Sequence, residues 1–317
     1  HRAQRDLERR AVLGLPETMT LPRGLDRGTL PRGPALEDVL PEPVCVPGER
    51  AARTAMNAWL NGPIDAYADR HDDLAGGTSA LSPYLRWGCL SPRELEQRAL
   101  DRGGKGAHAF VRQLAWRDFY AHVLLCFPEN ARHEFQERYR GLSWHDDADA
   151  LAAWQEGRTG YPLVDAGMRQ LAATGWMHNR ARMVVGSFLT KDLHLDWRAG
   201  EAWFEHLLLD GEPAQNNGNW QWIASTGVDP APYFRRMFNP VLQQRKFDAD
   251  GVYVRRWVPE LRDVPDVRLA EPWTMSAEEQ REAGCEIGRD YPAPIVDHAA
   301  ERRVAMDRYR AAAEAAA

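Results

Sequence analysis

The sequence predicts an all-α protein that begins with an extended, proline-rich segment. From Glu49 onward, apolar residues recur at helical spacing, and several segments open with a capping residue or a proline. The strand–helix alternation of a nucleotide-binding α/β domain is missing, as are a G-x-G-x-x-G motif and a P-loop. Seven prolines between positions 16 and 47 exclude a long helix there. We therefore expect a connector at 1–48 and a helical domain at 49–317.

Composition narrows the class of protein. A hydrophobic content of 44% over 317 residues is enough for a substantial core, and a net charge of -6 argues against wholesale coating by nucleic acid. The four cysteines are far apart and form no C-x-x-C pair, which favours reduced thiols in the cytoplasm. No apolar run reaches 18 residues. These features predict a soluble cytoplasmic protein without a metal site.

The first helices are marked by their end signals. Helical spacing over 49–67 is interrupted by Asn61-Gly62-Pro63, a stop signal followed by a short second segment. Ser82 precedes a proline and is expected to cap the next helix. Ser91 begins another, with Glu94 at the capping-box position.

The predicted helix at 107–127 carries an unusual face. Five of its residues lie within an arc of about 120°, namely Phe110, Gln113, Trp116, Arg117 and Tyr120. A core face does not normally include arginine, so Arg117 either pairs internally, binds an anion or reaches solvent. The face is consistent with a site for an anionic ligand.

Two further helices are expected in the middle of the chain. Tyr161-Pro162 opens a helix over 163–173, and after Gly175 another runs from 176 to about 192. On the second helix, Asn179, Arg182 and Met183 share a face. A terminal helix begins at about Ala299.

The stretch from Asp210 to Trp222 is expected to be irregular. Gly211, Pro213 and Gly218 interrupt helical periodicity, while amides and two tryptophans suit a flat ligand rich in heteroatoms. An anchored surface turn is the alternative. Residues 224–240 are also expected to be irregular, and the basic cluster Arg235, Arg236, Arg245 and Lys246 fits either a nucleic-acid surface or a solvated loop.

Conventional catalytic motifs are scarce. The chain has no H-E-x-x-H and no G-x-S-x-G, and its ten histidines are scattered. Arginines, amides and tryptophans can bind an anionic aromatic cofactor, but they cannot run acid–base chemistry. A bound cofactor would have to carry the reaction.

From about Glu49, the chain resembles the helical FAD-binding domain of the photolyase/cryptochrome family, and most closely class I cyclobutane pyrimidine dimer photolyases. The resemblance rests on the segments 78–82, 114–120, 160–169, 175–183, 210–222 and 231–240. Residues 1–48 resemble the interdomain connector. The α/β domain that holds the antenna chromophore precedes this stretch in the family, so no antenna chromophore is expected in this chain.

The resemblance implies FAD as the cofactor. Donors at 78–82 and Arg117 would bind its phosphates. Asn179, Arg182 and Asp210 would surround the isoalloxazine ring, with Arg182 paired to Asp210, and Asn216 would face flavin N5. The full predicted set is Tyr67, Thr78, Ser79, Ala80, Leu81, Ser82, Phe110, Arg117, Asn179, Arg182, Asp210, Glu212 and Asn216.

The resemblance also implies light-driven repair of pyrimidine dimers in DNA by a monomer, through electron transfer from reduced FAD. Trp220, Trp197 and Trp144 would pass electrons to the flavin, with Asn216 and Gln113 as further catalytic positions. The residues expected to contact substrate or DNA are Arg70, Gln113, Trp116, Arg180, Met183, Trp222, Arg235 and Lys246.

Some positions depart from the family pattern. Gln113 stands where dimer photolyases usually have Glu, Ala80 replaces a usual Arg, and Glu212 replaces a usual Asp. Asn179 and Met183 stand where (6-4) photolyases carry a histidine pair, which favours dimer repair. A flavin photoreceptor of the cryptochrome type and a helical nucleic-acid-binding module remain alternatives. Release of FAD from the purified protein would exclude the second of these.

Overall fold

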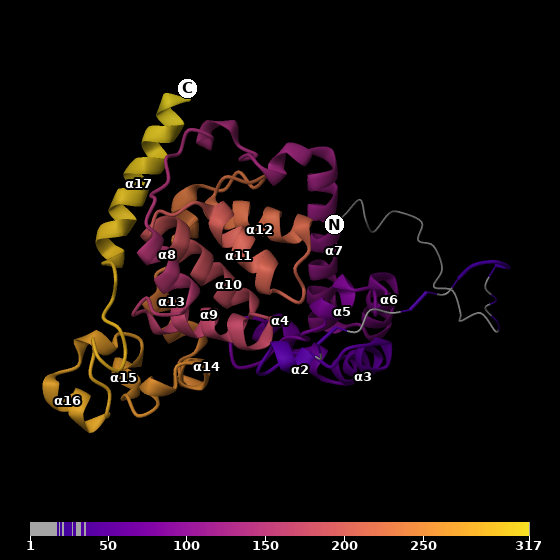
Figure 1. Ribbon diagram of the computed structural model, residues 1–317, viewed down its shortest axis with the longest axis horizontal. Coiled ribbons are helices and arrows are strands. Elements are labelled where there is room, and N and C mark those ends of the chain that lie inside the picture. Colours follow the sequence, from indigo (N-terminus) through magenta and orange to yellow (C-terminus); the bar gives the residue numbers. More distant parts are fainter. Residues whose placement is uncertain are drawn as a thin grey trace.

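A computed structural model describes residues 36–316, together with residues 18, 20, 22–26, 28–29 and 33–34. The described chain is helical, as predicted, and its extended pairing consists of isolated bridges such as His145 with Leu195 (Figure 1). Its α-helices are α2 (Leu36–Val39), α3 (Glu49–Leu60), α4 (Tyr67–Arg70), α5 (Ser82–Arg86), α6 (Pro92–Arg102), α7 (Gly104–Cys126), α8 (Ala148–Gln155), α9 (Pro162–Thr174), α10 (Asn179–Ser187), α11 (Trp197–Leu207), α12 (Pro213–Ala224), α13 (Pro240–Phe247), α14 (Val252–Trp257), α15 (Asp266–Leu269), α16 (Ala277–Glu282) and α17 (His298–Ala315).

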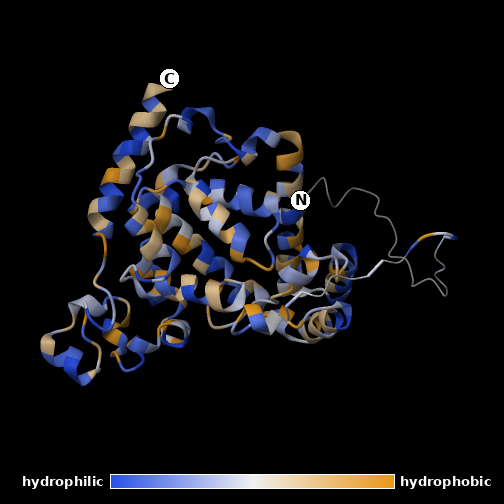
Figure 2. Ribbon diagram, in the orientation of Figure 1, coloured by the Kyte–Doolittle hydropathy of each residue, from blue (hydrophilic) through white to orange (hydrophobic). Residues whose placement is uncertain are grey.

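The apolar residues form two main clusters. The larger one surrounds α9 and α10, where residues such as Leu163, Met168 and Val184 are fully buried. The second packs α3, α4 and α6 against the first half of α7. The helices carry hydrophobic and hydrophilic residues in alternation, as expected when one side of each faces a core (Figure 2). Helix α7 also packs on α12, and it therefore joins the two clusters.

Some of the predicted helix ends and caps are confirmed, and others are wrong. Helix α3 ends at Leu60 with Asn61 as its C-cap, and Ser91 caps α6 by accepting the Glu94 N–H. The prediction for Ser82 is wrong, because Leu81 is the N-cap of α5 and the Ser82 hydroxyl donates to Asp210 instead. Glu94 does not complete a capping box in this structure, since its carboxylate accepts from Arg53.

The helix predicted from residue 176 begins three residues later. Gly175 adopts left-handed backbone at the end of α9, and the Thr174 hydroxyl accepts the Trp176 N–H, which holds the next residues extended. His178 is the N-cap of α10, and its Nδ1 accepts the Arg180 N–H at 3.1 Å. After Ser187 the helix widens into a π-helical segment, Phe188–Asp192.

The expectation of an irregular segment at 210–222 is also wrong, since α12 covers most of it. Pro213 lies in the first turn, where its missing N–H costs nothing, and Glu212 caps the helix by accepting the Gln215 N–H at 3.0 Å. Gly218 is a contact residue rather than a breaker. A Cβ at this position would lie 2.1 Å from the Tyr120 ring on α7.

The end of the predicted connector lies along α9. The Glu42 N–H donates to the Ala173 carbonyl at 2.9 Å, and the Val44 N–H donates to Thr174 at 3.3 Å. Most of residues 1–35 fall outside the described residues. The division at residue 48 therefore stays a prediction.

Candidate functional site

Asp210 is the centre of a polar cluster between the two halves of the molecule. Its carboxylate accepts the Ser82 hydroxyl at 2.6 Å and the Arg182 guanidinium at 2.8 and 3.1 Å. Trp176 Nε1 donates to the Ser82 hydroxyl at 3.2 Å. The predicted pairing of Arg182 with Asp210 is therefore present, and both lie beside Ser82, which is 128 residues away from Asp210 in the chain.

The loop that carries Asp210 is held from three sides. Arg86 Nε donates to the Gly211 carbonyl, and Trp87 Nε1 donates to the Leu209 carbonyl at 2.8 Å. The Leu209 N–H donates to Gly175 at 2.8 Å. These bonds fix the backbone on both sides of Asp210, so its carboxylate has a defined position.

The segment before α5 presents polar groups beside this cluster. Ala80 has a φ of 50°, and the Ser79 hydroxyl accepts the Leu81 N–H at 3.3 Å. Gly77 has a φ of 79°, and a Cβ there would meet the Arg70 carbonyl. The turn therefore requires glycine at 77.

Arg117 lies near the start of α12. Its carbonyl accepts the Gln215 amide at 2.7 Å, while its half-buried guanidinium has no hydrogen-bond partner among the described residues. A half-buried guanidinium without a partner is suited to an anion. Glu212, which replaces the family's usual Asp, uses its carboxylate to cap α12.

Two of the predicted cofactor-binding residues, Tyr67 and Phe110, pack within the second apolar cluster. The Tyr67 and Phe110 rings meet edge to face at 5.5 Å, and Trp59 packs on each at 5.7 Å. Burial raises the pKa of Tyr67 to about 12, so its phenol stays neutral. Trp59 was missed from sequence, and its Nε1 is a buried donor without a partner among the described residues.

Asn216 is held by α11. Its Nδ2 donates to the Glu201 carbonyl at 2.9 Å and to the Glu205 carboxylate at 3.4 Å. The Glu201 carboxylate accepts from Asn217 at 3.0 Å. Burial is the main cause that raises the pKa of Glu201 to about 7, and the Glu205 charge adds to it. Sequence reasoning missed both carboxylates, because their contacts with α12 form only in the folded chain.

The three tryptophans predicted to carry electrons belong to one apolar cluster. Trp220 and Trp197 are buried within it, and Trp144 is half-buried at its edge. The recorded ring contacts of Trp220 are with Phe204 at 5.0 Å and Trp154 at 6.2 Å. Trp154 was missed from sequence. The order of electron transfer stays a prediction.

The residues predicted to hold substrate differ in exposure. Trp116 is 49% exposed and stacks on Tyr120, and Gln113 is exposed one turn earlier. Met183 accepts the Asn179 amide through its sulfur at 3.6 Å, so these two share a face as predicted. Trp222 lies under the Arg236 guanidinium at 4.4 Å and donates to Asp229 at 3.0 Å.

The basic residues divide into different environments. The single cluster predicted at 235–246 is wrong, because Arg236 is buried and ion-paired with Asp229, while Arg245 pairs with Glu271. Arg235 is exposed. The remaining three predicted phosphate ligands gather near Phe247 and α4, and they are Arg70, Arg180 and Lys246.

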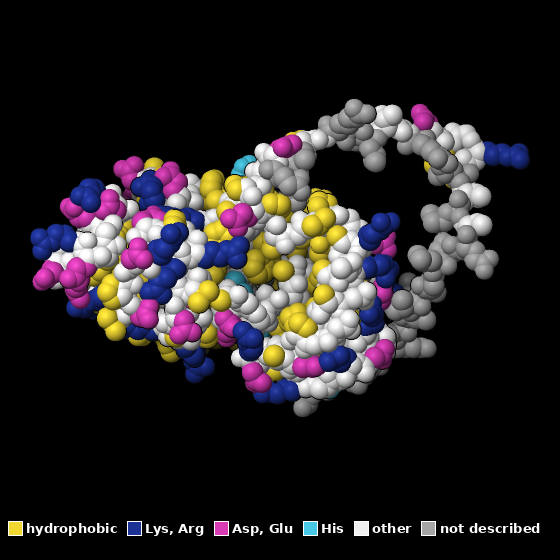
Figure 3. All heavy atoms as spheres, turned by 90° about the horizontal axis from the view of Figure 1, so that it is seen from below, with side chains coloured by type: hydrophobic (Ala, Val, Ile, Leu, Met, Phe, Trp, Pro, Cys, Tyr) yellow, Lys and Arg dark blue, Asp and Glu magenta, His cyan; other side chains and the backbone are white. Residues whose placement is uncertain are grey.

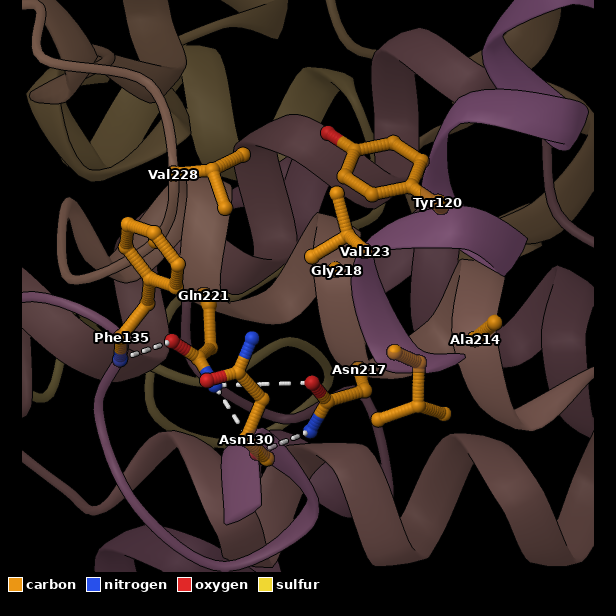
Figure 4. A pocket seen from close by; sticks show the side chains of 11 residues that line it. Tyr120, Val123, Asn130, Phe135, Ala214, Asn217, Gly218, Gln221 and Val228 are labelled. Carbon is orange, nitrogen blue, oxygen red and sulfur yellow. Dashed lines mark hydrogen bonds between the residues drawn. The ribbon is translucent and has the colours of Figure 1, made fainter. Parts of the chain in front are cut away.

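Two pockets in the described part of the chain are lined by residues other than these predicted phosphate ligands. One lies between α7, the loop that carries Asn130 and Phe135, and α12, and amides of Asn217 and Gln221 hold that loop (Figure 4). Its volume of about 10 Å³ is only enough for water. The other, of about 310 Å³, lies between the connector, α9 and α14 and is lined in part by Trp176. From below, the molecule is hollowed between its two sides, and hydrophobic side chains line the hollow (Figure 3).

Fold and site together define a helical domain in which a polar cluster joins segments far apart in the chain. Residues 110–311 match the family model for the FAD binding domain of DNA photolyase. The chain belongs to this family.

The relatives agree with that assignment. A deoxyribodipyrimidine photo-lyase from Streptomyces griseus is 48% identical over 93% of this chain and 62% of the relative. The crystal structure of a class III photolyase from Agrobacterium tumefaciens matches with a TM-score of 0.82 at 42% identity, over 86% of this chain and 57% of the other. A Synechocystis cryptochrome structure matches with a TM-score of 0.78 at 34% identity, covering 82% and 55%. This chain thus spans between 55% and 62% of the length of each of these three proteins.

The residues present fit the FAD that this family implies. Among the described residues, the Arg117 guanidinium has no partner and could bind a phosphate, and Trp59 and His178 each have a buried ring nitrogen without a partner. None of the helices in the described part of the chain is both long and apolar enough to span a lipid bilayer.

Proposed function

We propose that this chain binds FAD and repairs cyclobutane pyrimidine dimers in DNA under light. The observation that carries the proposal is the Ser82–Asp210–Arg182 cluster, which joins distant segments in a chain 48% identical to a photo-lyase. The whole enzyme's activity is part of the proposal, because the chain covers only part of its relatives. The class I assignment stays a prediction, since one solved relative is a class III photolyase.

The residues around Asp210 would bind and orient the flavin. When bound, reduced FAD supplies light absorption and the electron for repair. Arg117 with Thr78 and Ser79 would hold the phosphates, and Asp210, fixed by Arg182, would accept from the ring. The Glu201 backbone carbonyl and the exposed Glu205 carboxylate both accept from the Asn216 amide, so that this amide would present one orientation to the ligand.

On the substrate side, the exposed Trp116 would stack on a base removed from the duplex, with Met183 and Trp222 beside it. Arg70, Arg180, Arg235 and Lys246 would bind the flanking phosphates. Gln113 is a neutral amide one turn from Trp116, and we propose that it hydrogen-bonds the damaged base. Trp220, Trp197 and Trp144 would reduce the flavin from the surface inward.

The proposal is tested with purified protein. Denaturation should release FAD, and blue light under reducing conditions should restore thymine-dimer DNA to monomeric thymines. FAD release without any loss of dimer would support the photoreceptor alternative instead. Protein that neither retains FAD nor takes it up would contradict the proposal itself.

We also propose a monomer that acts in a reducing cytoplasm, because all four cysteines are free thiols. Residues 1–48 would act as the connector and 49–317 as the FAD- and DNA-binding domain.

A further inference from the structure

The guanidinium of Arg180 is already paired with a carboxylate in this structure. Its Nε and Nη2 donate to the two carboxylate oxygens of Asp72, at 3.2 and 2.6 Å. The Arg180 side chain is 15% exposed and that of Asp72 is 26% exposed. The flat face of the guanidinium lies over the Phe247 ring at 4.4 Å. Two independent contacts therefore hold this side chain in one orientation.

Asp72 accepts from the two N–H groups of Arg180 that a phosphate would also bind. Arginine recognises carboxylate and phosphate through the same pair of parallel N–H donors. The neighbouring Arg70 is also paired with a carboxylate, but through a single contact, with its Nη2 2.6 Å from Asp73 and its side chain exposed. One short loop after α4 thus supplies a carboxylate to two of the three arginines that are predicted to bind DNA phosphates.

The surroundings of Asp72 allow a phosphate to replace its carboxylate as the partner of Arg180. Asp72 is partly open to solvent, so its carboxylate can rotate into water without being left buried and unpaired. Phe247 would still support Arg180, and the exposed Lys246 ammonium lies over the same ring at 4.9 Å. His71 Nε2 lies 3.8 Å from Asp72 and offers it another partner.

We propose that Asp72 is a positioning residue that occupies the phosphate site of Arg180 until DNA replaces it. The inference rests on the proposed function, since it assumes that Arg180 meets a DNA phosphate. The carboxylate keeps the guanidinium aligned in the free protein and competes with the phosphate for it. Binding to undamaged DNA is weakened as a result.

The experiment measures binding of labelled duplexes, with and without a thymine dimer, by fluorescence anisotropy over a range of KCl concentrations. The variants are Asp72→Asn, Arg180→Gln and the double variant. The matched control is Asp69→Asn, which removes the same charge from the same region but from an exposed pair with Lys105. Circular dichroism confirms that each variant is folded.

Asp72→Asn should bind undamaged duplex about three- to tenfold more tightly than the parent chain, because one competing charge is gone. Its salt dependence should steepen by about one released counterion. Asp69→Asn should change affinity by less than about twofold. In the Arg180→Gln background, the effect of Asp72→Asn should disappear.

Other outcomes overturn the inference. Weaker binding by Asp72→Asn would mean that Arg180 needs the carboxylate in the complex as well. If Asp69→Asn increases DNA affinity as much as Asp72→Asn does, the increase comes from the change in net charge alone. The same conclusion follows if Asp72→Asn still increases affinity in the Arg180→Gln background. A parent chain that binds undamaged duplex but shows no preference for the dimer would count against the proposed function alone.

Discussion

At the residue scale, the Arg182–Asp210 pair should matter for both stability and the cofactor. The Asp210 side chain is 5% exposed, so removing Arg182 leaves a buried carboxylate without its cation. Arg182→Gln should lower the free energy of unfolding by about 2–3 kcal/mol, somewhat less than for a fully buried pair. It should also release FAD more readily, as gel filtration followed by absorbance would show.

The Arg256–Glu42 pair provides the control, because its side chains are 64% and 58% exposed. Arg256→Gln should change the free energy of unfolding by less than about 0.5 kcal/mol. If urea denaturation gives equal losses for the two variants, the special position of Asp210 is not supported.

The raised pKa of Glu201 predicts that the protein becomes less stable as pH rises. Its pKa is raised to about 7 in the folded state, chiefly by burial, whereas the unfolded value is near 4.5. The folded chain therefore binds the proton more tightly, and stability is lost as pH rises from about 4.5 to 7. Glu201→Gln removes that loss and should be more stable than the parent at pH 8 by about 1–2 kcal/mol, after discounting for partial exposure.

Thermal unfolding of Glu201→Gln and the parent at pH 4.5, 6 and 8 provides the measurement. The difference should grow with pH and level off above 7. A constant difference across this range would show that the carboxyl does not titrate as its burial implies.

At the scale of elements, Gly218 should be indispensable to the contact between α12 and α7. Alanine normally stabilises a helix interior by about 0.5–1 kcal/mol over glycine. Here the new methyl would lie 2.1 Å from the Tyr120 ring, so Gly218→Ala should instead destabilise the protein by about 3 kcal/mol. Denaturant unfolding monitored by circular dichroism measures this change.

Two further variants test whether the loss comes from the contact with Tyr120, the first of them at a loop glycine where a Cβ has room. Gly76→Ala meets nothing within 4 Å and should be nearly neutral. Gly218→Ala combined with Tyr120→Leu should recover part of the loss, because the ring is what the methyl meets. No recovery would point to a backbone cause.

Gly218 also explains what the sequence could not convey about α12. Local rules treat glycine and proline as breakers, yet Pro213 lies in the first turn and Gly218 is small because another helix crosses there. The start of α9 at Pro162 and the cap at Ser91 were predictable, since their signals are local. Ser82 was misread because its partner, Asp210, is 128 residues away.

The candidate site shows the same limit. The resemblance named Arg182 and Asp210 together, and the pair is present. Trp59, Glu201 and Asp72 were not predicted, because their importance comes from contacts made only in the folded chain. Ring order along the predicted electron path likewise depends on tertiary geometry.

At the scale of the whole molecule, the site lies where the two apolar clusters meet. The bonds from Ser82 to Asp210, from Arg180 to Asp72 and from Gln215 to Arg117 each join the two sides. Such bonds contribute about 1 kcal/mol when neutral and about 1.5–3 kcal/mol when a charged group takes part, so three of them couple the clusters only modestly without a ligand.

A ligand that contacts both sides should make the protein unfold as one unit. FAD at 100 times its Kd should stabilise the chain by about 2.7 kcal/mol, which at this size raises Tm by about 5 °C. The transition should also narrow, because the clusters can no longer open separately. Calorimetry of the chain with and without FAD measures both effects. ADP, which lacks the flavin ring, should give a smaller shift and leave the width unchanged. If FAD raises Tm without narrowing the transition, the bound cofactor contacts one cluster only.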